Sequence, residues 1–307
     1  MPDFDPTSSV IRQKEQSFSQ PQPQNNANPL ASFFRQPKIY ISLPSKGRFY
    51  PEGSLEKTEN NEYPVFAMTA RDELLFKTPD ALMNGQATVE VIKSCVPAIK
   101  DPWRLPSIDV DALLVSIRIA TYGEEMDVGA SCPKCNTKND FAVDLKGVLD
   151  KLNQIDFNDK VEIGSNMLVH LKPMDYSQIT KTALKTFEHQ RIFSIVNDDS
   201  LAEDQKVKMF QDSFIKLTDI TIEAAANCIH KIETSSGSTD NPEFIKEFLI
   251  KADKSVFKEV NDAINKSTEK GTMSSFSAKC QNKECGHEWT VALTMDQSDF
   301  FGQGFRT

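Results

Sequence analysis

The feature that most constrains this chain is a pair of cysteine motifs that lie far apart in the sequence. Cys132-Pro-Lys-Cys135 and Cys280-Gln-Asn-Lys-Glu-Cys285 are separated by residues 136–279. Each motif is followed by an aromatic residue and alternating apolar positions, beginning at Phe141 and at Trp289. Alternation with a period of two is typical of a strand that buries one face. The sequence therefore predicts two similar units, each a cysteine turn that leads into a strand.

The spacing of the cysteines within each motif favours a metal site. Zinc prefers thiolate ligands, and two such turns facing each other place four sulfurs at the corners of a tetrahedron. Gly286, directly after the second motif, suits the tight turn of a zinc knuckle. We therefore expect one structural Zn²⁺ in a split zinc ribbon, bound by Cys132, Cys135, Cys280 and Cys285. Four protein ligands leave no open position for substrate, so we expect no chemistry at the metal.

Three alternatives for these cysteines remain open. Disulfide bonds are disfavoured because no secretory signal begins the chain, and because Cys95 and Cys228 lie in apolar helical patterns. A thioredoxin-like redox pair is disfavoured because we expect a turn and a strand after Cys135, where that motif requires a helix. His287 could replace Cys280 as a ligand.

Composition and charge restrict the partners of the chain. Its 307 residues are 39% hydrophobic and 26% charged, and no apolar run approaches the length of a membrane span, so we expect no transmembrane segment. The formal net charge is −9, which repels phosphate backbones unless basic residues gather on one face. Nucleic-acid binding is therefore disfavoured, and the residues that would carry it surround the cysteine motifs: Lys134, Lys138, Lys279 and Lys283.

Patterning along the chain predicts an α+β fold that is mostly α. Residues 1–36 are rich in Gln, Asn and Pro, so we expect a disordered N-terminal arm. The expected domains after it are a small mixed α+β domain (37–122), the first half of the ribbon (123–147), a strand pair (148–172), an inserted helical bundle (173–270) and the second half of the ribbon with an aromatic tail (271–307). Within the mixed domain, Thr69-Ala-Arg-Asp72 is a helix-capping signal, and Ser107 or Asp109 is expected to cap a strong apolar helix.

Apolar residues repeat at helical spacing through the expected insertion. The three stripes are Ile179, Ala183, Leu184 and Phe187; Val207, Phe210, Phe214 and Leu217; and Ile222, Ala225, Cys228, Ile229 and Ile232. We expect these phenylalanines in the core of the bundle. Five other phenylalanines are candidate partner contacts, because they lie in polar or glycine-flanked ends of the chain: Phe33, Phe34, Phe300, Phe301 and Phe305.

Several segments resemble one family. The chain resembles baseplate hub proteins of T-even-like bacteriophages over roughly residues 38 to 145, where a P-S-x-G-x-x-Y turn, a T-A-x-(D/E)-E-x-L segment and a helix precede a cysteine pair in this order. The segments that carry the resemblance are Leu43–Tyr50, Met68–Leu75, Thr78–Gly85, Pro106–Tyr122 and Cys132–Cys135. The second cysteine pair adds a distant piece.

The resemblance implies a late viral protein of the contractile-tail baseplate hub, either a hub subunit or a hub assembly factor. Its partners would be other hub proteins, with no small-molecule substrate, in the host cytoplasm during tail assembly and in the virion. No arrangement of nucleophile, base and oxyanion donors is recognisable in the sequence, so we expect no enzymatic activity. The competing hypotheses are a nucleic-acid-binding zinc-ribbon protein and an enzyme that uses the ribbon as a structural module.

Overall fold

The computed structural model describes residues 28, 30, 33–154, 157, 159–164, 166–195, 203–269, 276–291 and 300–301. By their internal contacts, residues 1–35 and residues 36–307 form two units. Phe305 lies outside the described residues, as do most of the residues of the expected arm. The second unit contains two hydrophobic cores and the cysteine motifs, and it is described here in chain order.

The first core surrounds one central helix. Strand β1 (Pro37–Ser42) pairs antiparallel with β2 (Glu62–Phe66), and the helices are α1 (Ala70–Phe76), α2 (Pro79–Met83), α3 (Gln86–Cys95), a 3-10 turn η2 (Pro102–Arg104) and α4 (Ser107–Tyr122). Helix α4 is buried along almost its whole length, because its apolar residues face β1, β2 and α3 on several sides. The capping signal at Thr69 is confirmed: the Thr69 hydroxyl oxygen accepts from the Asp72 N–H, and the Asp72 carboxylate accepts from the Thr69 N–H.

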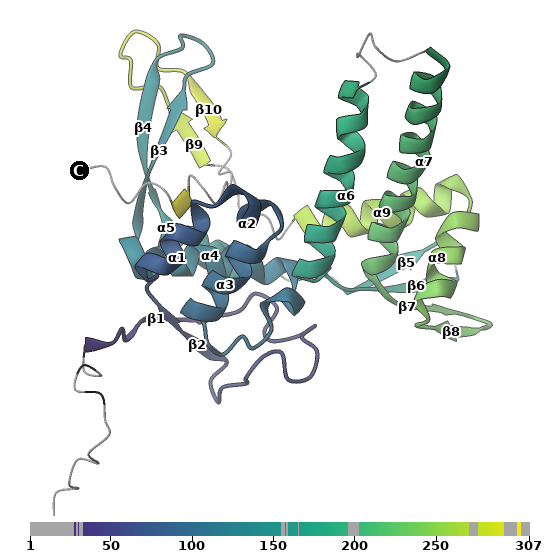
Figure 1. Cartoon of the computed structure of the whole chain (residues 1–307), viewed down its shortest axis with the longest axis horizontal. Helices are drawn as coiled ribbons and strands as arrows, with labels where there is room; N and C mark the ends of the chain where they lie inside the picture. The colour runs from purple at the N-terminus through teal and green to yellow at the C-terminus, as the bar shows by residue number, and fades with distance from the viewer. Residues whose placement is uncertain are drawn as a thin grey trace, which may run out of the picture. The chain divides into compact units, whose positions relative to one another are not determined.

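Two antiparallel hairpins carry the cysteine motifs. Strand β3 (Glu125–Ser131) pairs with β4 (Lys138–Asp144), which leads into helix α5 (Leu145–Asn153). Strand β9 (Phe276–Lys279) pairs with β10 (Glu288–Val291). The hairpins lie side by side although the insertion separates them in sequence (Figure 1). Each cysteine motif forms the connection between the two strands of its hairpin and leads into the strand that follows it, β4 or β10, as the sequence predicts.

The insertion combines helices with a four-stranded antiparallel sheet. The sheet has the order β5-β6-β7-β8, with β5 (Lys160–Ile163), β6 (Met167–Leu171), β7 (Ile229–Thr234) and β8 (Gly237–Thr239). Helices α6 (Tyr176–Ile195) and α7 (Glu203–Asn227) run side by side, and α8 (Pro242–Lys251) and α9 (Lys254–Glu269) follow the sheet (Figure 1). Residues such as Val169, Ile232 and Leu249 form the second core. The fold is therefore α+β with more helix than strand, which confirms the predicted class.

The prediction of helices almost throughout residues 173–270 is wrong at β7 and β8. Ile229 and Ile232 are both buried and lie three residues apart, which imitates the spacing of a helix. A β-bulge causes this spacing: His170 pairs with Lys231 and Leu171 pairs with Ile229, so His230 has no partner in the ladder. The extra residue hides the alternation by which a strand is recognised.

The expectation that the phenylalanines of α6 and α7 are core residues is also wrong. Phe187, Phe210 and Phe214 are 47%, 45% and 62% exposed. A pair of helices shares a single seam, so side chains that point away from the seam remain at the surface unless a further element covers them. Among the described residues, no helix combines the length and the apolar character of a membrane-spanning segment.

Candidate metal centre

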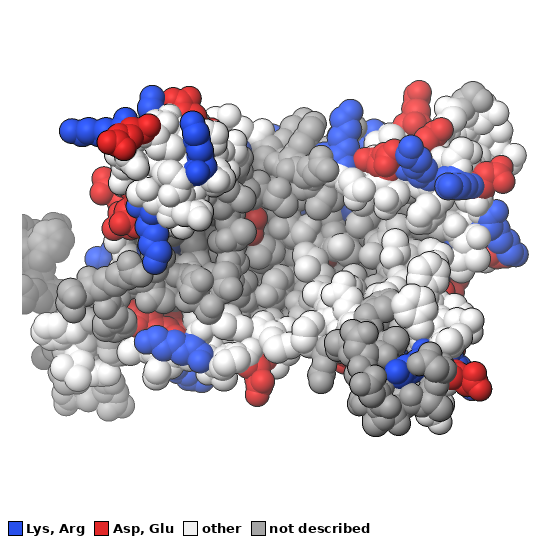
Figure 2. Space-filling view, turned by 90° about the horizontal axis from the view of Figure 1, so that it is seen from above, with Lys and Arg blue, Asp and Glu red and all other residues white. Residues whose placement is uncertain are grey.

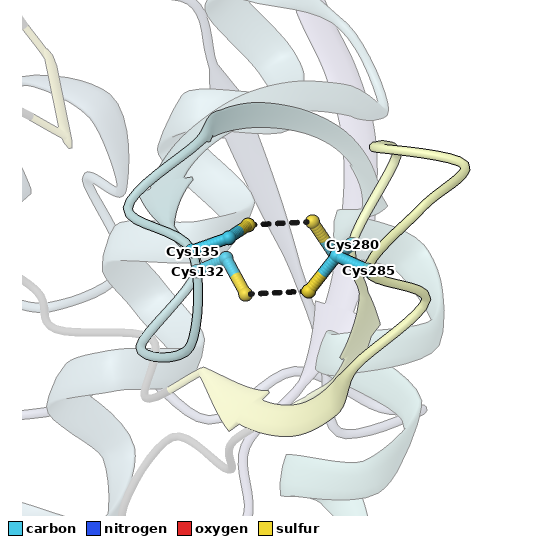
Figure 3. Close-up of side chains that lie close together, drawn as sticks. All are labelled: Cys132, Cys135, Cys280 and Cys285. Atoms are coloured by element: carbon cyan, nitrogen blue, oxygen red, sulfur yellow. Dashed lines mark hydrogen bonds between the residues drawn. The ribbon is translucent and has the colours of Figure 1, made fainter.

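The structure brings the four cysteines of the two motifs together. The four sulfur atoms lie within 4.8 Å of one another, two from each hairpin, and point toward a common centre (Figure 3). Cys132 and Cys280 are buried, Cys285 is half-buried and Cys135 is exposed. Residues remote in sequence thus form a cluster of the size and composition that can hold a metal ion.

Distances between sulfurs separate a metal site from disulfides. The Cys132 sulfur lies 3.9 Å from that of Cys285, and the Cys135 sulfur lies 3.6 Å from that of Cys280. A disulfide bond is only about 2.0 Å long. Four sulfurs at the usual zinc–sulfur distance in a tetrahedron would be about 3.8 Å apart. The arrangement therefore has the dimensions of a four-thiolate metal site, and all four cysteines are free thiols.

The two cysteine turns have the same local geometry. The Cys132 N–H donates to the Thr137 carbonyl at 2.9 Å, and the Cys280 N–H donates to the His287 carbonyl at 2.8 Å. Each acceptor lies two residues after the second cysteine of its motif. The intervening residue has a positive φ in both turns, 56° at Asn136 and 52° at Gly286. Glycine adopts this conformation without steric cost and asparagine adopts it more readily than most residues, so the sequence is suited to both turns.

Asn139 connects the two hairpins directly behind the cysteines. Its side-chain oxygen accepts from the Gln281 N–H at 2.7 Å, and its amide donates to the Thr137 carbonyl at 2.7 Å. The Gln281 side chain in turn donates to the Asp140 carbonyl at 2.7 Å. Asn139 is 1% exposed. Neither Asn139 nor Gln281 can be recognised from the sequence, because nothing in the local pattern distinguishes them from surface amides.

Aromatic side chains fill the space between the hairpins. The Phe141 ring lies edge-on to Phe276 at 5.6 Å and to Trp289 at 5.9 Å between ring centroids. These contacts join β4 to both strands of the other hairpin. The His287 ring stacks on Trp289 and is not part of the sulfur cluster, so the structure gives no support to His287 as a replacement ligand.

The environments of the thiols differ. Hydrogen bonds from the Thr137 hydroxyl and backbone lower the pKa of Cys135 to about 6. Burial raises the pKa of Cys280 to about 11. A metal ion binds thiolates, so it would have to displace the proton from the buried sulfur, and binding would release protons to the solvent.

The lysines around the cysteine turns do not form a continuous basic surface. Lys134, Lys138 and Lys283 are exposed, but Lys279 is 3.0 Å from the Glu288 carboxylate across its own hairpin. On the face seen in Figure 2, basic and acidic side chains are interspersed. This distribution gives no support to the nucleic-acid-binding hypothesis, since a phosphate backbone requires basic residues gathered along one track.

A second buried polar cluster lies in the first core, at the turn of residues 43–50. The Asp109 carboxylate accepts from the Ser45 N–H at 2.7 Å, the Ser45 hydroxyl at 2.5 Å and the Tyr50 hydroxyl at 2.9 Å. Asp109 is completely buried, and burial raises its pKa to about 6. The expectation that Ser107 or Asp109 caps α4 is wrong: the helix begins after Pro106 without a side-chain cap, and Asp109 instead anchors a distant turn.

Phe300 and Phe301 are not exposed at the surface. Phe300 and Phe301 are 4% and 5% exposed and belong to the first core. Phe301 stacks on Phe76 with 4.4 Å between ring centroids, and the Arg118 guanidinium lies over the Phe300 ring and donates to the Phe300 carbonyl. Their prediction as partner contacts is wrong, because the first core of the chain itself buries these rings. In the other unit, Phe33 and Phe34 are 83% and 57% exposed, so their prediction as partner contacts still stands as a prediction.

The fold and the four thiols define a class: an α+β protein in which a closed set of thiols, able to hold a metal ion, joins two hairpins at either end of a large insertion. The family model described as T4 bacteriophage base plate protein matches residues 37–302, and the chain belongs to this family. No curated protein and no solved structure matches the chain significantly. The family match thus confirms the resemblance to baseplate proteins that the sequence indicates. The matched region also includes the insertion and the second hairpin, beyond the residues that carry the resemblance.

Proposed function

We propose that the protein is a non-enzymatic interaction component of the baseplate hub, acting as a hub subunit or as a hub assembly factor. The observation that carries this proposal is the closed four-thiol cluster in a member of the baseplate family. Four protein ligands saturate a tetrahedral ion, so the centre would fix the hairpins in place and leave no position for a substrate. A rigid scaffold that presents surfaces to other phage proteins is the role that this arrangement supports.

We propose that Zn²⁺ is the ion. Four thiolates are soft ligands, which select zinc over magnesium or calcium, and the sulfur–sulfur distances fit a tetrahedron of zinc dimensions. The ion would hold structure and contribute to folding, because its ligands come from hairpins that the chain must first bring together.

Metal analysis of the purified protein tests this assignment. We expect one zinc per chain, and a fall in the thermal unfolding temperature when a strong chelator removes it. Replacing Cys132 and Cys135 with Ser should abolish the zinc content, whereas Cys228→Ala, which alters a cysteine of the second core, should leave it at one. Zinc-free protein with unchanged unfolding in chelator would contradict the proposal.

Affinity purification from phage-infected cells tests the hub role. We expect a tagged copy to retain other hub proteins in stoichiometric amounts, and a monomer that retains none would contradict the proposal.

Quantitative mass spectrometry of purified particles and of the infected lysate distinguishes a hub subunit from a hub assembly factor. A subunit persists in particles at a fixed copy number, whereas an assembly factor is abundant in the lysate and depleted from particles.

A further inference from the structure

A cleft of about 510 Å³, lined by both charged and apolar residues, lies beside the turn of residues 43–50. Arg48 and Arg104 line it from the first core, and Lys172, Asp175 and His230 line it from the insertion. Backbone hydrogen bonds fix the two sides relative to each other: the Ser107 N–H donates to the Met174 carbonyl and the Tyr176 N–H donates to the Leu105 carbonyl, both at 2.8 Å. The cleft is therefore built on two connected parts of the fold.

The turn that presents Arg48 is conformationally strained. Lys46, Gly47 and Phe49 have φ values of 55°, 73° and 70°, a region that residues other than glycine rarely occupy. The three hydrogen bonds from Ser45 and Tyr50 to Asp109 hold the turn in this conformation. Strained backbone of this kind persists where the surroundings over-determine it, and it is concentrated at functional sites. The turn thus positions Arg48 at the cleft.

The opposite side of the cleft contains the β-bulge of β7. His230 is the bulged residue, unpaired in the ladder and exposed, and it lines the cleft. Bulges often redirect a side chain toward a functional site. A distorted backbone segment therefore lies on each side of the same cleft.

The charge of the cleft is positive in a chain whose net charge is −9. The Arg104 guanidinium is 3.0 Å from the Asp175 carboxylate, and the Arg48 guanidinium is 3.7 Å from the Asp159 carboxylate. Arg48 also donates from Nε to the Ser45 carbonyl at 3.4 Å and lies over the Phe49 ring. Lys172 has no ion pair within the described part of the chain. At least one cation is thus left to attract an anion, next to guanidiniums that already contact carboxylates.

We propose that this cleft binds the carboxylates of an acidic segment of a partner protein. This inference rests on the proposed interaction function and names the chemistry of one contact. Lys172, which has no ion pair among the described residues, and the neighbouring guanidiniums of Arg48 and Arg104 match one carboxylate. Arginine binds carboxylates through paired N–H donors. A nucleic-acid backbone needs an extended basic track, whereas the lining of this cleft includes the Asp175 carboxylate among its few charged residues.

Fluorescence anisotropy with a labelled hexaglutamate peptide tests the proposal. We expect saturable, salt-sensitive binding to the full-length protein, and a dissociation constant roughly tenfold higher for the variant Arg48→Gln with Lys172→Gln. The matched control, Lys208→Gln with Lys254→Gln, removes the same charge from exposed positions on α7 and α9 and should stay within about twofold of the wild type. Thermal unfolding verifies that both variants fold, and single Lys172→Gln and Lys208→Gln variants replace the pair if they do not.

Two outcomes would overturn the proposal. Equal peptide affinity in the cleft variant and the control would show that the cleft is not the site. Tighter binding of a labelled hexathymidylate than of the peptide, lost in the cleft variant, would identify the ligand as nucleic acid. Affinity purification of hub proteins with the same variants tests the general role separately. If the protein still recovers hub proteins but does not bind the peptide, the cleft proposal alone is contradicted and the proposed hub role stands.

Discussion

Asp109 holds the turn of residues 43–50 against α4 through three hydrogen bonds. Replacing it with Ala would leave the buried Ser45 N–H and hydroxyl without an acceptor. We expect Asp109→Ala to lower the free energy of unfolding by about 2–4 kcal/mol, because buried polar groups that lose their partner retain their full desolvation cost. Urea unfolding measures the loss. A change below about 0.5 kcal/mol, the range of ordinary surface substitutions, would contradict this account.

The raised pKa of Asp109 makes stability depend on pH. Its carboxyl has an ordinary pKa of 3.8 and a pKa of about 6 in the folded protein, so the folded state binds the proton more tightly than the unfolded state. The stabilisation that comes from protonated Asp109 is therefore fully present below about pH 4, and it is lost as the pH rises through about 6.

Asp109→Asn removes this titration while keeping the shape of the side chain. We expect the unfolding free energy of the wild type, relative to that of Asp109→Asn, to fall by about 1–3 kcal/mol between pH 4 and pH 7. Both proteins contain the same cysteines, so any release of metal in acid affects them equally. A difference that stays constant across this range would contradict the assignment.

Asn139 supports the four-thiol cluster without belonging to it. Its hydrogen bonds to Gln281 and Thr137 fix the two cysteine turns relative to each other. We expect Asn139→Ala to weaken zinc binding by about tenfold in competition with a chelator, while the stoichiometry stays at one, because outer groups of this kind orient the ligands. Asn84→Ala, at an exposed asparagine outside both hairpins, is the control. Equal affinity in the two variants would show that the cysteines alone fix the site.

At the scale of elements, the sequence predicts structures whose signal is local. The alternation after each cysteine motif indicates β4 and β10, and β5 and β6 lie within residues 148–172, where the sequence predicts a strand pair. Strand β7 is not predicted from the sequence, because the bulge at His230 places two buried isoleucines at helical spacing. The hydrogen-bonding roles of Asp109 and Asn139 are not predicted either. Their partners Ser45 and Gln281 lie 64 and 142 residues away, and no local pattern indicates such a pairing.

The α6–α7 pair shows that exposed surfaces are also difficult to predict from the sequence. Its phenylalanines have the spacing of core residues, and helical periodicity alone cannot distinguish a face covered by the chain's own fold from one left at the surface. The number of elements that pack around a helix is a property of the whole fold.

At the scale of the whole molecule, residues 300 and 301 pack into the first core although its other elements lie far from them in sequence. Phe301 stacks on Phe76 of α1, and Phe300 lies beneath Arg118 of α4. We expect Phe301→Ala to destabilise the protein by about 3–4 kcal/mol in chemical unfolding, since it would leave a cavity in the first core. Phe33→Ala, at a residue that is 83% exposed, should change stability by less than about 0.5 kcal/mol. Similar effects of the two substitutions would contradict the buried position of Phe301.

The separation of the two cysteine turns has a consequence for the order of events during synthesis. Cys280 follows Cys135 by 145 residues, so at about 5–20 residues per second the first turn leaves the ribosome roughly 7–30 seconds before its counterpart. Only a polypeptide translated as far as Cys285 can supply all four sulfurs. Closure of the four-thiol cluster therefore requires that the whole insertion between the two cysteine turns has already been synthesised.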